Sequence, residues 1–221
     1  MVNMSEQFIH TDGTIIPVGI MYCIGRNYLE HAKEMGSELP SEPVVFIKPA
    51  TAHAISGSKI AIPTFSENMH HEVELVVVIG KDCNNVSESE AMDYVSGYGV
   101  GIDFTLRDVQ MKAKESGLPW ATSKSFYSSA PVSNIIPIDL ISEPNNCKIE
   151  LFVNNKPVQS GYTSDMQRTV PQLISYISHV FRLRKGDCIF TGTPQGVGQV
   201  VSGDKLLAKL DDKITLDIEI E

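Results

Sequence analysis

Two carboxylates stand close together in the segment His70-His71-Glu72-Val73-Glu74-Leu75, which runs into the apolar residues 76–79 and ends at Gly80. In a β-strand, residues two apart point to the same face, so Glu72 and Glu74 are expected to project together from one end of a buried strand. Adjacent carboxylates repel each other unless a cation lies between them, and Mg²⁺ and Mn²⁺ prefer oxygen ligands. The pair therefore indicates either a metal site or an exposed strand end with solvated acids.

A second candidate pair, His31 and Glu34, stands three residues apart in a segment that is expected to form a short helix. This spacing places both side chains on one helical face, where the carboxylate holds the imidazole and raises its basicity. A pair of this kind can activate water, but it is also common as a weak ion pair on a polar surface. From the residues alone, both roles remain open.

The elements that must position these side chains are short strands and short helices. Strands are expected at residues 20–24, 73–79, 98–104 and 187–191, with a hairpin at 148–160 that turns at Asn154-Asn155 and a strand pair at 205–210 and 213–220. Helices are expected at 28–35, 87–95, 105–117 and 171–181. Asn27 is expected to cap the first helix, and a Ser87-to-Glu90 capping box is expected to open the second. Many short strands and few helices indicate a β-rich fold.

Composition excludes several classes of partner. The chain has 221 residues, 42% of them hydrophobic, and a formal net charge of -9. An acidic chain of this size suits one globular unit and argues against nucleic acid or an anionic membrane as a partner. No apolar run is long enough to span a membrane, and residues 1–9 lack the pattern of a signal peptide, so a cytoplasmic protein is expected. The four cysteines are scattered, which argues against a zinc site or a disulfide framework.

The familiar nucleophile elbow, phosphate loop and dinucleotide fingerprint do not occur in the chain. Its ordered motifs instead resemble the fumarylacetoacetate hydrolase superfamily, and within it the short single-domain acylpyruvate hydrolases and oxaloacetate decarboxylases. The motifs that carry this resemblance are Gly25-Arg26-Asn27-Tyr28 with His31 and Glu34, Phe46-Ile47-Lys48-Pro49, the Glu72 segment, Asp103-Phe104-Thr105 with Arg107-Asp108, Gly117-Leu118-Pro119-Trp120 with Lys124, and Thr191-Gly192-Thr193-Pro194 with Gly196-Val197-Gly198.

The resemblance implies a fold and an organisation for the chain. The fold is a β-rich α+β architecture, the mixed β-sandwich roll of the family's C-terminal domain, with short peripheral helices. Residues 20–221 would form the catalytic domain and residues 1–19 a short N-terminal lead-in. A homodimer is also implied.

Carried over residue by residue, the resemblance makes Glu72, Glu74 and Asp103 the ligands of a Mg²⁺ or Mn²⁺ ion. Three oxygen ligands leave about half of an octahedral shell open for water and substrate. The alternative role for Asp103 is that of a helix-capping acid ahead of Thr105.

The same carry-over assigns the remaining site residues. His31 with Glu34 would activate water, and Lys124 would neutralise an oxyanion of the substrate. Substrate binding falls to four side chains: Arg26, Arg107, Gln110 and Thr193. Arg26 and Arg107 could bind a distal carboxylate or pair with structural acids, and Asp108 offers Arg107 such a partner.

The implied substrate is a small α-keto acid, and the implied enzyme is a metal-dependent hydrolase or lyase. It would cleave a carbon–carbon bond in an acylpyruvate, decarboxylate oxaloacetate, or do both, through a metal-bound pyruvate enolate. One alternative is isomerisation of the 2-hydroxyhepta-2,4-diene-1,7-dioate type. The other is a keto-acid-binding protein that has kept the fold without catalysis.

Overall fold

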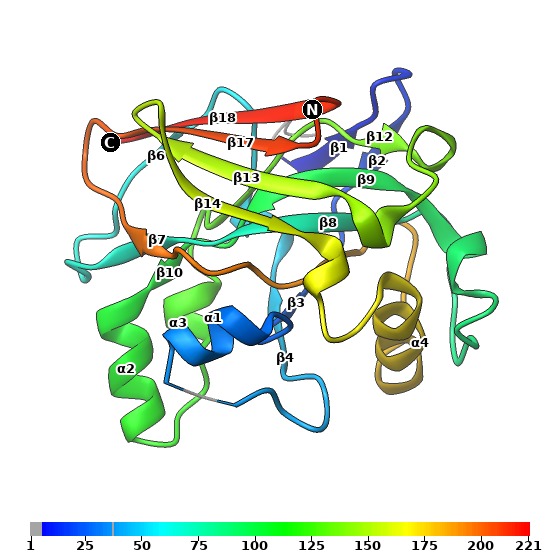
Figure 1. Cartoon of the computed structure of the whole chain (residues 1–221), viewed down its shortest axis with the longest axis horizontal. Coiled ribbons are helices and arrows are strands. Elements are labelled where there is room, and N and C mark those ends of the chain that lie inside the picture. Colours follow the sequence, from blue (N-terminus) through cyan, green and yellow to red (C-terminus); the bar gives the residue numbers. More distant parts are fainter. Residues whose placement is uncertain (1–5, 37) are drawn as a thin grey trace.

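A computed structural model describes residues 6–36 and 38–221 of the chain. Two β-sheets and their shared core dominate the fold, and the helices lie along one side (Figure 1). The helices are α1 (Leu29–Glu34), α2 (Arg107–Glu115), α3 (Ala121–Lys124) and α4 (Val170–Val180), with 3-10 turns η2 (Ala50–Ala52), η3 (Ala91–Tyr94), η4 (Ile138–Leu140), η5 (Pro144–Asn146) and η6 (Thr163–Asp165).

The larger sheet has eight strands and mixes parallel with antiparallel pairs. Its order is β4-β3-β15-β8-β9-β11-β5, and β12 pairs with β9 at the side. The strands are β3 (Met21–Ile24), β4 (Val45–Lys48), β5 (His53–Ile55), β8 (Val73–Ile79), β9 (Val95–Ile102), β11 (Ala130–Val132), β12 (Ile136–Pro137) and β15 (Cys188–Phe190).

A five-stranded sheet in the order β14-β13-β17-β18-β6 lies above β8 and β9 in the view of Figure 1. Its strands are β6 (Lys59–Ile60), β13 (Lys148–Val153), β14 (Lys156–Tyr162), β17 (Lys205–Leu210) and β18 (Ile214–Ile220). Two small sheets complete the fold, β10 (Thr105–Leu106) with β7 (Met69–His71) and β16 (Gly198–Gln199), and β1 (Gln7–Ile9) with β2 (Ile15–Pro17).

Strand β8 lies at the centre of the molecule, and all seven of its residues are buried. Because side chains alternate along a strand, Val73, Leu75 and Val77 enter the main core beneath the five-stranded sheet, whereas Val76 and Val78 enter a second core on the opposite face. A strand buried on both faces explains why the sequence is continuously apolar here rather than alternating.

The β-rich class and the sandwich-roll architecture expected from the sequence are confirmed. The hairpin of β13 and β14 turns at Asn154 and Asn155, whose φ angles of 51° and 64° are the left-handed values that asparagine tolerates. The predicted strand pair near the C-terminus is formed by β17 and β18.

Two local predictions are wrong. The segment expected to be a helix at 87–95 forms only the η3 turn, because Val95 already begins β9 and pairs with Ile79 of β8. The main-chain N–H of Ser87 does donate to the carboxylate of Glu90 at 3.3 Å, which is one of the two bonds of a capping box. The long-range sheet pairing therefore overrides a local helix signal. Asn27 does not cap α1, since its buried amide donates to the carbonyl oxygens of Thr191 and Arg168.

The expected lead-in at 1–19 contains the β1–β2 hairpin, and its first five residues lie outside the described part of the chain. Phe8 and Ile16 of this hairpin are buried in the second core, beside Cys23 and Phe190 of the larger sheet. The hairpin is therefore packed against the sheet that carries β8.

Candidate metal centre

Three carboxylates meet at the end of β8. Glu72 directly precedes that strand and Glu74 is its second residue, while Asp103 directly follows β9, the neighbour of β8 in the sheet. Oxygen atoms of all three lie within 4.8 Å of one another, and the residues are only 4%, 2% and 1% exposed. The alternative of a solvated strand end is therefore wrong, and Asp103 lies in this cluster.

Cations of the chain surround two of these carboxylates. The Lys124 ammonium lies 2.6 Å from Oε2 of Glu72 and also contacts Oδ2 of Asp103. Arg107 donates to the other oxygen of Glu72. Lys48, which is fully buried, lies 2.8 Å from Oδ1 of Asp103. Charge-assisted contacts of this kind make the burial of Glu72 and Asp103 tolerable.

Glu74 has a different environment. The hydrogen bond that it accepts is from the main-chain N–H of Gly192, at 2.7 Å, and the described residues place no cation within ion-pair distance of it. Burial, reinforced by the charges of Asp103 and Glu72, raises the pKa of Glu74 well above its usual range. Burial acts in the same direction on Glu72, but Arg107 and Lys124 outweigh it and hold the pKa of Glu72 well below its usual range.

This donor set fits a divalent cation that prefers oxygen. Three buried carboxylates from adjacent strand ends supply hard ligands, and the uncompensated position of Glu74 is the kind of environment that a bound cation would relieve. Glu72, Glu74 and Asp103 are the residues that could hold it.

A pocket of about 280 Å³ opens beside the cluster, and Glu72 is the carboxylate of the three that lines it. Six of the site residues expected from the sequence line it: Arg26, His31, Glu72, Arg107, Gln110 and Lys124. Gly25, Met35, Lys114 and Trp120 complete the lining. The fold thus gathers residues from α1, α2, α3 and the start of β8 around one space.

The His31–Glu34 pair lies at the edge of this pocket. Nδ1 of His31 is 3.2 Å from Oε2 of Glu34, and the same carboxylate accepts the main-chain N–H of Gly196 at 3.0 Å. His31 is buried although α1 is otherwise a polar helix. Glu34 does not line the pocket itself, so it contacts the imidazole from behind.

Thr193 is placed differently from the other expected substrate-binding residues. It is buried outside the pocket lining, and its hydroxyl accepts a hydrogen bond of 2.9 Å from Gln159. The side-chain oxygen Oε1 of the same Gln159 accepts from the main-chain N–H of Val73 and lies 2.9 Å from Nδ1 of His71. The side chain of Gln159 therefore connects the start of β8 to the loop that follows β15 through hydrogen bonds.

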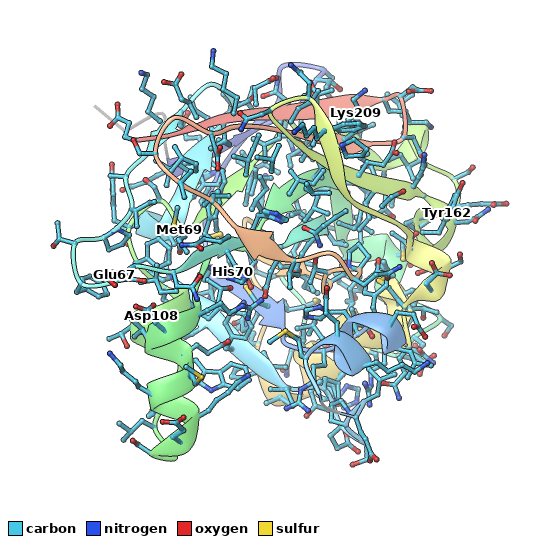
Figure 2. All side chains as sticks on the ribbon, turned by 60° about the vertical axis from the view of Figure 1, so that its left-hand side comes forward. Glu67, Met69, His70, Asp108, Tyr162 and Lys209 are labelled. Atoms are coloured by element: carbon cyan, nitrogen blue, oxygen red, sulfur yellow. The ribbon has the colours of Figure 1, made fainter. Side chains whose placement is uncertain are left out.

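Asp108 does not pair with Arg107. Its carboxylate instead accepts from the hydroxyl of Ser66 and the N–H of Glu67, and Figure 2 shows Asp108 at the start of α2, close to Glu67. Arg107 is left free to bind Glu72 and the side-chain oxygen of Gln110, which is 2.9 Å away. The guanidinium thus faces the pocket rather than a structural acid on its own helix.

Four residues that shape the site received no role from the sequence: Lys48 and Trp120, which belong to motifs that carry the family resemblance, and Lys114 and Gln159, which belong to none. Two signals were available in the sequence. Lys114 follows Arg107 and Gln110 at helical spacing, and a lysine inside the apolar segment of Phe46 and Ile47 is unusual for a strand. Nothing in the local sequence points to Gln159, because its contacts are long-range.

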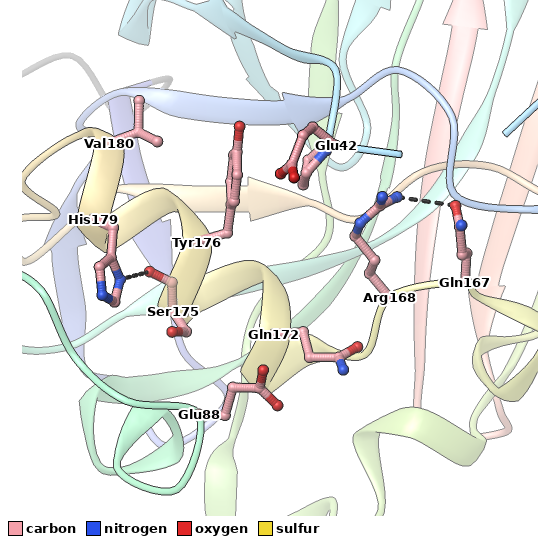
Figure 3. Close-up of a pocket in the computed structure, with 10 residues that line it drawn as sticks. Glu42, Glu88, Gln167, Arg168, Gln172, Ser175, Tyr176, His179 and Val180 are labelled. Carbon is pink, nitrogen blue, oxygen red and sulfur yellow. Dashed lines mark hydrogen bonds between the residues drawn. The ribbon is translucent and has the colours of Figure 1, made fainter. Parts of the chain in front are cut away.

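A separate cavity of about 590 Å³ runs along α4, between Glu42, Arg168, Tyr176 and His179 (Figure 3). Arg168 contacts Gln167 there, and His179 contacts the carbonyl oxygen of Ser175. Among residues 6–36 and 38–221, the cluster of Glu72, Glu74 and Asp103 is the one group of three potential metal ligands, and it does not line this cavity.

Comparison with protein families matches the fumarylacetoacetate (FAA) hydrolase C-terminal model to residues 20–221. The oxaloacetate tautomerase FAHD1 of Bos taurus, described as mitochondrial, is 48% identical over 199 residues, which are 90% of each chain. The oxaloacetate tautomerase YcgM of Escherichia coli is 45% identical over 196 residues, 88% of this chain and 90% of the relative.

Among solved structures, fumarylpyruvate hydrolase from Pseudomonas aeruginosa in complex with Mn²⁺ and pyruvate superposes with a TM-score of 0.93. It is 37% identical, and the match covers 100% of this chain and 97% of that one. Within the described residues, no helix is both long and apolar enough to cross a membrane. The cytoplasmic location and the homodimer stay predictions.

Proposed function

The chain belongs to the fumarylacetoacetate hydrolase family, and from this premise we propose that it catalyses the keto–enol tautomerisation of oxaloacetate. The observation that carries the proposal is the gathering of His31, Lys124 and Arg107 around one pocket beside a buried carboxylate cluster. The relatives named oxaloacetate tautomerases, which match nine-tenths of the chain, support the choice of reaction.

The chemistry requires a proton to leave C3 of the keto form and another to reach the C2 oxygen, and the reverse when the enol is consumed. His31, held by Glu34, is the group that accepts the proton at carbon, since imidazole exchanges protons near neutral pH. The Lys124 ammonium donates a hydrogen bond to the oxygen on which negative charge develops. That oxygen then takes its proton from water, and His31 returns the proton from C3 to water. Arg107 and Gln110 orient the substrate from α2.

A Mg²⁺ or Mn²⁺ ion held by Glu72, Glu74 and Asp103 would supply Lewis-acid polarisation of the keto acid's oxygens. Thr193 is proposed as a further substrate-binding residue, for the part of the substrate that lies toward the loop after β15. The cation itself is proposed from the donor set and from the Mn²⁺ named with the neighbouring hydrolase.

A second candidate is hydrolytic cleavage of an acylpyruvate, which the His31–Glu34 pair favours. His31 would take a proton from a water molecule as its oxygen adds to the distal carbonyl. The adjacent carbon–carbon bond then breaks, and its electron pair passes to the pyruvate fragment, which is protonated to pyruvate while the acyl part leaves as a carboxylate. The fumarylpyruvate hydrolase among the structural neighbours supports keeping this candidate. Decarboxylation of oxaloacetate would leave the same pyruvate fragment.

One set of assays separates these activities. Purified protein with Mg²⁺ or Mn²⁺ is mixed with oxaloacetate or acetylpyruvate while the enol absorbance and pyruvate release are followed together. Faster enol–keto exchange of oxaloacetate without pyruvate indicates the tautomerase, whereas pyruvate from oxaloacetate indicates the decarboxylase and pyruvate from acetylpyruvate the hydrolase. The absence of any acceleration over buffer with the same metal would refute the proposed function.

A further inference from the structure

Helix α2 presents three polar side chains to the pocket, Arg107, Gln110 and Lys114. Their spacing of three and four residues places them on one helical face, one above the next. Arg107 and Gln110 stand at the inner end, where Arg107 contacts Glu72. Lys114, one turn beyond the buried Gln110, continues the row to an exposed position on the helix.

The cations of this pocket differ in what they contact. Arg107 and Lys124 are both engaged by Glu72, and Lys124 also by Asp103. No carboxylate lies within 4.0 Å of the Lys114 ammonium among residues 6–36 and 38–221, and the same holds for Arg26, which donates to the carbonyl oxygen of Glu38. Two cations at the pocket therefore have no carboxylate within ion-pair distance in the described part of the chain.

Trp120 holds Lys114 in place. The Lys114 ammonium lies 5.2 Å from the centre of the indole ring, within cation–π range, and Trp120 itself lines the pocket. A side chain at Gly25 would come within 3.3 Å of the same ring, so the glycine makes room for Trp120. Partial burial lowers the pKa of Lys114, and the charges of Arg107 and Arg26 act in the same direction.

We infer that Lys114 and Arg26 form a subsite for the second carboxylate of an α-keto diacid, and that Lys114 selects such a substrate over keto acids with an uncharged tail. The inference rests on the proposed function, because it takes the reacting keto acid to lie at the Glu72 end of the pocket. Arg107 and Lys124 then serve the end that reacts, whereas Lys114 and Arg26 bind the charged tail. Lys114 is a binding residue in this scheme and takes no part in proton transfer.

The test compares substrates that differ in the charge of the tail. Oxaloacetate carries the second carboxylate, and acetylpyruvate ends in a methyl group. In Lys114→Met, KM for oxaloacetate is expected to rise at least about tenfold, because a charge-assisted hydrogen bond is lost. Its kcat and both constants for acetylpyruvate should stay within about threefold of wild type. Lys114→Arg, which keeps the charge, should retain the preference.

Lys112→Met is the matched control, because Lys112 is exposed on the same helix and does not line the pocket. Binding is measured separately by calorimetry with Mn²⁺ present, using 2-oxoglutarate and the uncharged-tail analogue 2-oxopentanoate. The wild type should bind the diacid more tightly, and Lys114→Met should remove most of that difference while leaving the affinity for 2-oxopentanoate unchanged.

The outcomes separate this inference from the proposed function. If wild type turns over neither substrate, the proposed function fails. The calorimetric comparison of 2-oxoglutarate with 2-oxopentanoate still tests whether Lys114 binds the second carboxylate. Equal losses for the diacid and the uncharged-tail compound in Lys114→Met, or no loss for either, would overturn the inference. An equal effect of Lys112→Met would overturn it too, since the charge of the helix as a whole would then be responsible.

Discussion

The main-chain N–H of Gly192 donates a hydrogen bond of 2.7 Å to Oε2 of Glu74. Gly192 has a φ of 98°, and a side chain there would approach Cβ of Asn27 to 2.8 Å, so glycine is required at this position. The contact fixes the orientation of Glu74 without neutralising it. Glu74 is consequently the carboxylate of the cluster that depends most on a cation from outside the chain.

Replacing Glu74 by glutamine is expected to abolish binding of Mg²⁺ and Mn²⁺ while preserving the fold. Glutamine has the same size and can still accept the Gly192 hydrogen bond, but it removes a charged ligand. The measurement is the rise in thermal unfolding temperature on adding Mn²⁺, which should occur in wild type and vanish in Glu74→Gln. Glu67→Gln, an exposed acid near α2, should respond as wild type. A full Mn²⁺ response in Glu74→Gln would contradict the assignment of this ligand.

The affinity for Mn²⁺ is expected to weaken as the pH falls. Burial and the neighbouring carboxylates raise the pKa of Glu74 well above its usual range, so a proton competes with the cation for this carboxylate at higher pH than at an ordinary glutamate. Release of one proton corresponds to about a tenfold change in the dissociation constant for each pH unit over the range in which Glu74 is protonated. Calorimetry in two buffers with different ionisation enthalpies counts the protons released. A pH-independent affinity with no proton release would show that Glu74 is already ionised.

His31→Ala is expected to lower turnover by about 10²- to 10⁴-fold, the usual contribution of a general base. Glu34→Gln should cause a smaller loss, because the imidazole stays in place but loses the carboxylate that holds it. Both variants should keep the Mn²⁺-induced thermal shift of wild type, since neither residue belongs to the carboxylate cluster. Full activity in His31→Ala would remove its role in proton transfer and leave the metal centre unaffected.

Lys48→Met is expected to lower the free energy of unfolding by about 3–5 kcal/mol, the usual cost of removing one partner of a buried ion pair. Lys48 contacts Asp103 and the hydroxyl of Ser129, and its loss leaves a buried carboxylate with one fewer cation. Urea unfolding of the metal-free protein measures this free energy. Lys59→Met, which removes an exposed pair with Glu219, should unfold at the wild-type urea concentration. A Lys48→Met protein as stable as this control would show that Asp103 does not need the ammonium.

Much of the architecture could be predicted because local patterns and the fold agree. Continuous apolar residues in 73–79 indicate a strand buried on both faces, and Asn154-Asn155 fits the positive φ of its hairpin. The two-residue spacing of Glu72 and Glu74 sufficed to bring their carboxylates together. These features depend on neighbours in the sequence.

The features that could not be predicted depend on residues far apart in the chain. The 87–95 segment carries a helix signal, but the partner strand β8 decides its conformation. Gln159 contacts Val73 and Thr193, each more than 30 residues away, and no local pattern marks such a residue. The buried position of Lys48 likewise becomes intelligible only when Asp103 and Ser129 are placed around it.

The β1–β2 hairpin has a practical consequence for how the protein can be handled. Phe8 and Ile16 fill the second core together with Cys23 and Val76, and the strand of Val76, β8, also carries Glu74 of the carboxylate cluster. A shortened chain that begins at residue 20, the first residue of the family match, would expose this apolar surface to solvent and so favour aggregation. Affinity tags are therefore better attached after residue 221, and trimming of the N-terminus should stop before the hairpin.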